Sequence, residues 1–275
     1  MKILVTGANG YLGQGIVSAL CNNGHEVIAT DFKSDHIDSR AQIIESDIFQ
    51  VEDISSKFLK PDALLHLAWK DGFMHNSANH LNDLPQHYAF LEKAAASGIK
   101  EISVMGTMHE IGFIEGSINE NTPCHPMNLY GISKNSLRDA TELLCMKYNV
   151  VFKWLRGFYI VGNSSFGSSI FSKIAIAEID GTLEFPFTSG QNQYDFLDYE
   201  DFCKYVALAC SQNKINGIIN ISSGKPEKLA DRVEQFISEN SYKIKLKYGA
   251  YPDRAYDSKA VWGDNTKLLA ILKDK

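Results

Sequence analysis

The stretch Thr6-Gly7-Ala8-Asn9-Gly10-Tyr11-Leu12-Gly13 (TGANGYLG) decides the fold of this 275-residue chain. It directly follows the short apolar run Ile3-Leu4-Val5 and opens a segment with helical periodicity. Glycine at positions 7, 10 and 13 allows a tight turn and close packing of helix on strand, and the helix N-terminus offers free N–H groups to phosphates. The stretch therefore predicts a strand, a turn and a helix that bind a dinucleotide, with a plain strand-to-helix turn as the alternative.

Short apolar runs alternate with longer amphipathic segments through the first 160 residues. Several of the runs are continuous rather than alternating, as is typical of buried parallel strands. Strands are expected at Lys2–Val5, Glu26–Thr30, Ala41–Glu45, Ala63–Leu67, Glu101–Met105 and Val151–Leu155, and helices at Gly13–Asn22, Leu84–Ser97 and Leu129–Tyr148. This alternation predicts an α/β fold, a Rossmann-type doubly wound parallel sheet.

The pattern changes after Arg156, where glycine and serine cluster in Gly162–Ser169. We expect a loop that leaves the sheet there, and a hairpin where Thr188–Asn192 interrupts the aromatic-rich segment Leu183–Phe202. The run Ile218–Ile221 has the composition of one more strand. The expected organisation is a dinucleotide-binding domain over residues 1–162, whose sheet residues 217–223 rejoin, and an interleaved smaller C-terminal substrate lobe over residues 163–275.

The composition argues against several classes of function. The net charge of −6 leaves no basic surplus for nucleic acid or for an anionic membrane, and no 18-residue apolar span occurs. The five cysteines are an odd number without a C-x-x-C pair, which disfavours disulfides and structural zinc. We therefore expect a cytoplasmic protein without nucleic acid, membrane or metal as a partner.

An acidic residue stands where a dinucleotide site needs one. Asp31 lies 18 positions beyond Gly13, at the end of the second expected strand. A carboxylate there accepts hydrogen bonds from ribose hydroxyls and repels a 2′-phosphate, which favours NAD, although the nearby Lys33 keeps NADP possible and a solvated turn carboxylate is the alternative. The residues expected at the cofactor are Gly7, Asn9, Gly10, Tyr11, Leu12, Gly13, Asp31, Asp47, Ile48, Leu67, Ala68, Trp69, Tyr130 and Lys134.

A Tyr and a Lys four residues apart open the helix after the fifth expected strand. Tyr130 and Lys134 share one helix face, and Thr107 ends that strand where a ligand crevice forms in such sheets. A free Tyr has a pKa of about 10, and we expect the ammonium and a positive nicotinamide ring to lower it. In this hypothesis Thr107 holds a substrate oxygen while Tyr130 exchanges its proton and hydride passes at the same carbon.

These motifs together resemble those of extended short-chain dehydrogenases/reductases of the NAD-dependent epimerase/dehydratase family, over nearly the whole chain. The resemblance implies a nucleotide-sugar substrate between the two lobes and a homodimer formed through the helix with Tyr130 and Lys134. It rests on Thr6–Gly13, Asp31, Asp47-Ile48, His66-Leu67-Ala68, Gly106-Thr107, Tyr130 with Lys134, Leu155-Arg156-Gly157, Val161-Gly162-Asn163, Tyr194–Asp201, and Asn220 with Ser223–Pro226.

Departures from the family pattern narrow the expected reaction. Sugar-nucleotide dehydratases of the family follow the catalytic Thr with Asp-Glu, whereas this chain has Met108 and His109. Tyr194 replaces an arginine that often meets the substrate pyrophosphate, so Arg254 is proposed as the cation instead. The chain is also shorter than usual for the family's 4-epimerases. It is most similar to reductases of 4-keto-6-deoxy sugar nucleotides.

The expected function is thus an NAD(H)-dependent oxidoreductase that transfers hydride at C4 of a nucleotide-activated deoxy sugar, in deoxysugar and polysaccharide biosynthesis. A nucleotide-sugar 4-epimerase is the enzymatic alternative. A non-catalytic NAD-sensing regulator is the alternative from another class, although such proteins commonly lose the Tyr or the Lys. The residues expected to contact substrate are Thr107, Met108, His109, Asn163 and Arg254.

His109 leaves two hypotheses open. A zinc site of the H-E-x-x-H type fails because Phe113 stands four residues later, and the spacing of the three histidines between positions 75 and 87 is no better. His109 either acts as a second acid or base beside the sugar ketone, or hydrogen-bonds in a loop and shapes the pocket. Glu110 is expected to brace this loop through backbone N–H groups.

Overall fold

The computed structural model describes residues 1–162, 169–253 and 257–274, and its main element is a seven-stranded parallel sheet. Asn163 and Arg254, both proposed for the substrate, lie outside the described residues. In spatial order the strands are β11 (Gly217–Ile221), β7 (Val151–Gly157), β5 (Glu101–Thr107), β4 (Ala63–His66), β1 (Lys2–Thr6), β2 (Glu26–Thr30) and β3 (Gln42–Ile43).

The direction of winding reverses at β1, which pairs with β2 on one side and with β4 on the other. A crevice at the carboxyl ends of the strands is expected at such a switch point. The segment expected as a strand at 218–221 is β11, which pairs in parallel with β7 at the edge of the sheet. The doubly wound Rossmann-type fold predicted from the sequence is confirmed.

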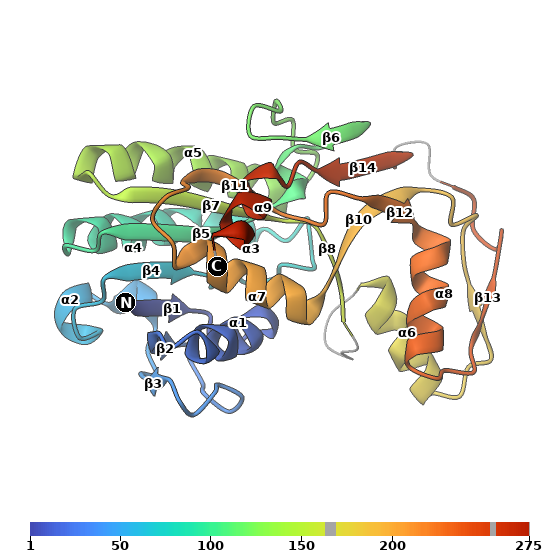
Figure 1. Cartoon of the computed structure of the whole chain (residues 1–275), viewed down its shortest axis with the longest axis horizontal. Helices are drawn as coiled ribbons and strands as arrows, with labels where there is room; N and C mark the ends of the chain where they lie inside the picture. Colours follow the sequence, from blue (N-terminus) through green and yellow to red (C-terminus); the bar gives the residue numbers. More distant parts are fainter. Residues whose placement is uncertain (163–168, 254–256, 275) are drawn as a thin grey trace.

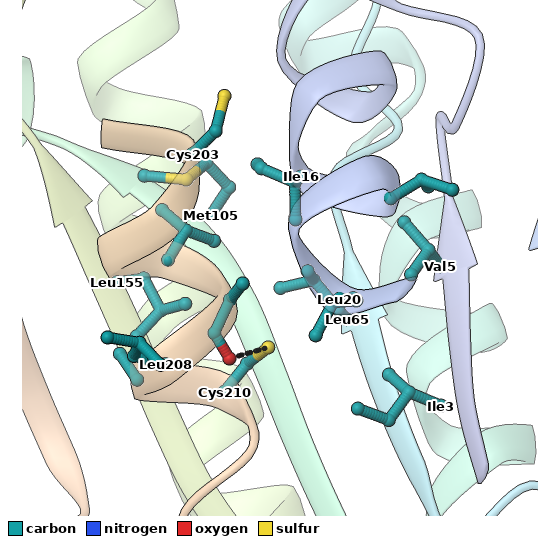
Figure 2. Packing of buried hydrophobic residues seen from close by; sticks show 14 of the residues in the cluster. Ile3, Val5, Ile16, Leu20, Leu65, Met105, Leu155, Cys203, Leu208 and Cys210 are labelled. Carbon is teal, nitrogen blue, oxygen red and sulfur yellow. Dashed lines mark hydrogen bonds between the residues drawn. The ribbon is translucent and has the colours of Figure 1, made fainter. Parts of the chain in front are cut away.

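Helices cover both faces of the sheet (Figure 1). On one face α1 (Tyr11–Asn22), α7 (Tyr199–Cys210) and α9 (Thr266–Lys273) share one apolar core, and Figure 2 shows Ile16 and Leu20 on the side of α1 that faces α7. On the other face α2 (Ile54–Lys57), α4 (Leu84–Ala96) and α5 (Leu129–Tyr148) share a second core, with α3 (Asn79–Asn82) beside α5. The 3₁₀ turns η1 (Ile48–Gln50) and η2 (Met108–Glu110) follow β3 and β5.

A smaller group of elements lies beyond the carboxyl ends of β1 and β4 (Figure 1). Its sheet contains β12, β10, β14 and β6 in that order, and β8 also pairs with β10. The helices α6 and α8 pack around a separate apolar core. The bounds are β6 (Gly116–Ile118), β8 (Tyr159–Val161), α6 (Ile170–Ile179), β9 (Glu184–Pro186), β10 (Gln193–Asp198), β12 (Pro226–Lys228), α8 (Leu229–Glu239), β13 (Lys245–Lys247) and β14 (Ala260–Gly263).

The hairpin expected around Thr188–Asn192 is wrong. The strands on either side of it belong to different sheets, because β9 pairs in parallel with β13 whereas β10 pairs with β12, β14 and β8. Gly190 has a φ of 66°, and a Cβ there would lie 2.7 Å from the side chain of Ala230 on α8. The segment is therefore a connection that packs against α8. The strands β9 and β10 on either side of it do not pair with each other.

Most other predicted boundaries differ from the structure by one or two residues. The helix at Leu129–Tyr148 and the strand at Glu26–Thr30 have the predicted bounds, while β3 is shorter than expected. Within the described ranges, none of the helices combines the length and the hydropathy needed to cross a membrane.

Candidate active site

The glycine-rich turn has the geometry that the sequence predicted for close backbone approach. Gly7 has a φ of 68°, and a Cβ on it would lie 2.6 Å from the backbone nitrogen of Ala68 at the end of β4. A Cβ on Gly13 would lie only 2.2 Å from the carbonyl oxygen of Gly7. Gly10 caps α1 without a side-chain hydrogen bond, which leaves the N-terminal N–H groups of this helix available to an anion.

Asp31 is tied directly to this turn. One carboxylate oxygen accepts the backbone N–H of Asn9 at 3.0 Å, and the other accepts that of Phe32 at 2.8 Å. Asn9 in turn accepts the backbone N–H of His36 at 2.9 Å. A carboxylate directly after β2, beside a helix N-terminus whose N-cap is glycine, fits the ribose and pyrophosphate of a dinucleotide.

Other residues expected at the cofactor lie at the carboxyl ends of the neighbouring strands. The Asp47 side chain caps η1 by accepting the backbone N–H of Phe49 at 3.0 Å, and Ile48 is buried. Leu67 and Ala68 follow β4, with their backbone N–H groups donating to Thr6 at 3.2 and 3.4 Å. These contacts hold the ends of β1 and β4 together at the switch point of the sheet.

A cavity of about 900 Å³ lies beside the glycine turn but does not include the predicted catalytic residues. It is lined by Asn9, Tyr11 and Gln14 on one side and by α7 on the other. Three carboxylates also line it, namely those of Asp198, Glu200 and Asp201. Because carboxylates repel phosphates, this cavity is a poor place for a substrate pyrophosphate.

The structure brings Thr107, Tyr130 and Lys134 together at the end of β5. Thr107 is 7% exposed, and its hydroxyl is hydrogen-bonded to the Tyr130 phenol. Asn128 caps α5 by accepting the backbone N–H of Gly131 at 2.8 Å, which places Tyr130 and Lys134 in the first two turns of the helix. The three groups can hold an oxygen and exchange its proton, as the sequence predicted.

The pKa shifts of the pair need one correction. Burial raises the pKa of Tyr130 above its usual value, and the hydrogen bond with Thr107 lowers it less than burial raises it. The expected lowering of this pKa is therefore wrong for the chain itself, because loss of hydration outweighs the local partners. Burial also lowers the pKa of Lys134 to about 7, while the charge of Glu110 opposes that change.

Glu110 braces the loop as predicted. Its side chain is fully buried and accepts the backbone N–H of Thr107 at 2.7 Å and the indole N–H of Trp154 at 2.8 Å. Its other carboxylate oxygen lies 3.4 Å from Arg156 and 3.6 Å from Arg138. Two cations and two N–H donors thus compensate this buried charge.

His109 packs against Tyr130 rather than standing free in the crevice. The two ring centres are 6.0 Å apart, and the ring centre of His75 lies 4.3 Å from that of His109. Burial and the neighbouring His75 lower the pKa of His109 to about 4, so its imidazole is neutral near pH 7. A neutral ring in this place can hydrogen-bond a substrate and shape the pocket. Met108 packs on the apolar cluster around Ile111.

One residue of the site, His75, had no signal in the sequence. His75 stacks on Tyr130 at 5.7 Å, and its carbonyl accepts the Tyr130 backbone N–H at 2.9 Å. His75 lies in a loop without periodicity, so the sequence did not predict its position beside Tyr130. Arg156 and Trp154 did carry a signal, because they sit two residues apart in a strand expected to be buried. Among the described residues, no group of His, Cys, Asp or Glu has the arrangement of a metal site.

A model of the family described as "NAD dependent epimerase/dehydratase family" matches residues 3–222, which is most of the chain. The chain belongs to this family. A relative named dTDP-6-deoxy-L-talose 4-dehydrogenase (NAD(+)), from Aggregatibacter actinomycetemcomitans, is 46% identical over 96% of this chain and 99% of its own length. A UDP-glucose 4-epimerase from Lactobacillus helveticus is 24% identical over 99% of this chain and 91% of its own.

Solved structures share the fold of this epimerase/dehydratase-family chain. A UDP-N-acetylglucosamine 4-epimerase from Methanobrevibacter ruminantium has a TM-score of 0.83 at 22% identity and covers 98% of this chain and 91% of its own. A Thermus thermophilus UDP-glucose 4-epimerase in complex with NAD has a TM-score of 0.79 at 19% identity, with coverages of 98% and 92%. At these identities the likeness establishes the Rossmann-type architecture.

Proposed function

We propose that this protein is an NAD-dependent oxidoreductase that interconverts the 4-hydroxyl and 4-keto forms of a nucleotide-activated 6-deoxy sugar. The observation that carries the proposal is the hydrogen-bonded pair Thr107 and Tyr130, with Lys134 on the same helix face, beside a dinucleotide turn. The relative named as a dTDP-6-deoxy-L-talose 4-dehydrogenase supports the choice of sugar, because its 46% identity extends over almost both whole chains. A deoxythymidine diphosphate sugar is therefore the first substrate to test.

The cofactor would be held by the glycine turn and by Asp31. NAD, when bound, takes up or supplies the hydride at the sugar carbon. Thr107 holds the sugar oxygen by a hydrogen bond, and Tyr130 takes its proton during oxidation or returns it during reduction. Lys134 stabilises the phenolate with its positive charge.

The neighbours of Thr107 support hydride transfer over dehydration. Elimination of water needs an acid and a base beside the sugar, and Met108 is apolar while His109 is a neutral, buried imidazole. We propose that His109 shapes the pocket and hydrogen-bonds the sugar, rather than moving a second proton. Deuterium exchange from solvent into the carbon beside the ketone would contradict this assignment.

The test is a coupled measurement of NADH with purified protein. A panel of 6-deoxy and 4-keto-6-deoxy sugars on deoxythymidine, uridine and guanosine diphosphates is incubated with NAD or NADH. We expect a change in NADH absorbance with at least one sugar, and a loss of about 10²–10⁴-fold in kcat for Tyr130→Phe, which keeps the ring but cannot exchange the proton. No change in absorbance with any member of the panel would refute the proposal.

A nucleotide-sugar 4-epimerase is the second candidate. It is favoured by the full-length likeness to a UDP-glucose 4-epimerase at 24% identity. An epimerase would convert its substrate without net formation of NADH, so the same panel distinguishes the two activities when products are separated by chromatography. The regulatory alternative predicts that Tyr130→Phe retains full biological activity.

We further propose that α6, α8 and the strands β6, β8, β9, β10, β12, β13 and β14 form the substrate lobe, whereas α7 and α9, expected in that lobe, pack on the main sheet. We also propose that the protein is a cytoplasmic homodimer of polysaccharide biosynthesis. Leu143 and Met146 on α5 are 67% and 69% exposed, and a second copy of α5 would cover them. Free cysteines fit a reducing compartment. Light scattering should give the dimer mass for the native protein and the monomer mass for Leu143→Lys with Met146→Lys.

A further inference from the structure

Lys134 has an unusual way of keeping its charge inside the protein. Lys134 is 3% exposed, and its ammonium group donates a hydrogen bond to the carbonyl oxygen of Met105 at 2.9 Å. Across the described ranges, no carboxylate lies within ion-pair distance of it, because Glu110 pairs with Arg138 and Arg156 instead. A buried ammonium without such a partner needs another source of stabilisation.

The face of Trp69 provides that stabilisation. The Lys134 ammonium lies 3.9 Å from the centre of the Trp69 ring, which is the geometry of a cation–π contact. The negative face of an indole attracts a cation more strongly than the face of any other natural side chain, and more so when water is absent. Trp69 also approaches Tyr130, with 6.2 Å between the ring centres.

Two histidines contact the indole and fix its orientation, and a third holds one of them in place. The Trp69 N–H donates to Nδ1 of His80 at 3.0 Å, so that nitrogen is the acceptor and the other one carries the proton to the Met74 carbonyl. His87 stacks on the indole with 4.5 Å between ring centres. Nε2 of His66 is hydrogen-bonded to Nδ1 of His87 at 2.9 Å, which holds His87 in turn. The orientation of the Trp69 ring beside Lys134 is thus fixed by a hydrogen bond at its edge and by stacking on its face.

A neutral partner differs from a carboxylate in one respect that matters for catalysis. A carboxylate beside Lys134 would cancel its field at Tyr130, whereas a ring face and a carbonyl hold the ammonium and leave its full unit charge. The titratable and charged groups around Lys134 are Tyr130 on its own helix, Glu110 of η2, His66 of β4 and His87 of α4. Both of these histidines are kept neutral by burial, so neither adds a competing charge.

We infer that Trp69 is a positioning residue of the reaction, whose ring face holds the Lys134 ammonium in its charged form beside Tyr130. The catalytic consequence rests on the proposed oxidoreductase function, but the contact itself does not. The inference assigns to Trp69 a role separate from the cofactor contact expected at the end of β4.

The test changes the electrons of the indole and leaves its shape nearly unchanged. Protein is produced with tryptophan, with monofluorinated tryptophan and with tetrafluorotryptophan, each with ¹³C at the lysine Cε. The Lys134 signal is identified by its loss in Lys134→Met, and its chemical shift is followed against pH without substrate. Because fluorine withdraws electrons from the ring face, we expect the Lys134 midpoint to fall stepwise, by roughly one pH unit in total.

The matched control is Trp69→Phe labelled in the same way, in which fluorine remains only at Trp154 and Trp262. Its Lys134 midpoint should not depend on fluorination. Equal midpoints across the series in the unmutated protein, or an equal dependence in the control, would overturn the inference. Because this titration needs no substrate, its result is separate from whether any sugar nucleotide is turned over.

Turnover gives the second measurement. The alkaline limb of the kcat profile should move to lower pH by the same amount as the Lys134 midpoint, with KM changing less than kcat. A limb that stays in place while the midpoint moves would contradict the catalytic part of the inference.

Discussion

Glu110 and Thr107 form a capping box at the start of η2. The Glu110 carboxylate accepts the Thr107 backbone N–H at 2.7 Å, and the Thr107 hydroxyl accepts the His109 backbone N–H at 3.3 Å. The Thr107 hydroxyl therefore has one lone pair committed to the loop and its proton available for an oxygen. Its position depends on a fully buried carboxylate.

Glu110→Gln tests this dependence. The amide would bring N–H groups toward Trp154 and Arg156 and leave the buried guanidinium without its charge partner, so we expect unfolding free energy to fall by about 3 kcal/mol. Urea unfolding measures this, and kcat should fall more than KM rises. Glu52→Gln, at a side chain that is 84% exposed, is the control and should change little. Unaltered stability and kcat would show that Glu110 does not position Thr107.

Gly13→Ala should prevent binding of NAD. The added Cβ would lie 2.2 Å from the Gly7 carbonyl, so the turn would have to open and its N–H groups would lose their common direction. Isothermal calorimetry should show at least a 100-fold weaker Kd, which corresponds to about 2.7 kcal/mol. Gly72→Ala is the matched control, because a Cβ there meets nothing within 4 Å. Equal affinities of the two variants would contradict the assigned site.

Lys134→Met should stabilise the protein while abolishing turnover. Lys134 has a pKa of about 7 in the folded chain against 10.5 for a free lysine, so the unfolded chain binds one more proton between these values. Stability therefore rises with pH through this window, and the full cost is present below pH 7. We expect a gain of about 3 kcal/mol at pH 6, with a smaller gain at pH 10. Equal denaturation midpoints for both proteins at pH 6 would rule this out.

The buried pair His66 and His87 should make the fold sensitive to acid. Burial lowers both pKa values, that of His87 to about 3, so the unfolded chain binds more protons as pH falls from 6.5 toward 3. Stability is then lost over this range. Melting temperatures of His87→Leu should fall less steeply below pH 6 than those of the native protein. His36→Gln, at an exposed histidine, should keep the native slope.

The sheet could be predicted because its signals are local. Most of the parallel strands contain a short apolar run, and the turn at Gly7 needs a conformation that glycine adopts readily. The hairpin at Thr188–Asn192 failed because a polar interruption between two strands does not reveal which strand is the partner. That choice depends on contacts with α8, which lies more than thirty residues later.

The candidate site could be predicted in its residues but less well in its electrostatics. Thr107, Tyr130 and Lys134 follow from their positions at the ends of elements. The raised pKa of Tyr130 follows from burial, which spacing does not report. The contact between Trp69 and Lys134 joins the end of β4 to α5 and could not be read from either segment alone.

Because the chain returns to its first sheet with β11, the edge of that sheet is completed late in synthesis. β11 closes the edge of β7 in parallel only after the intervening lobe sequence has been made. During synthesis, the N–H and C=O groups along that edge of β7 stay unpaired until about sixty more residues have been made. Over that time they can pair with another chain. We therefore expect nascent chains that stop before Gly217 to aggregate, and chains that extend past Ile221 to remain in solution.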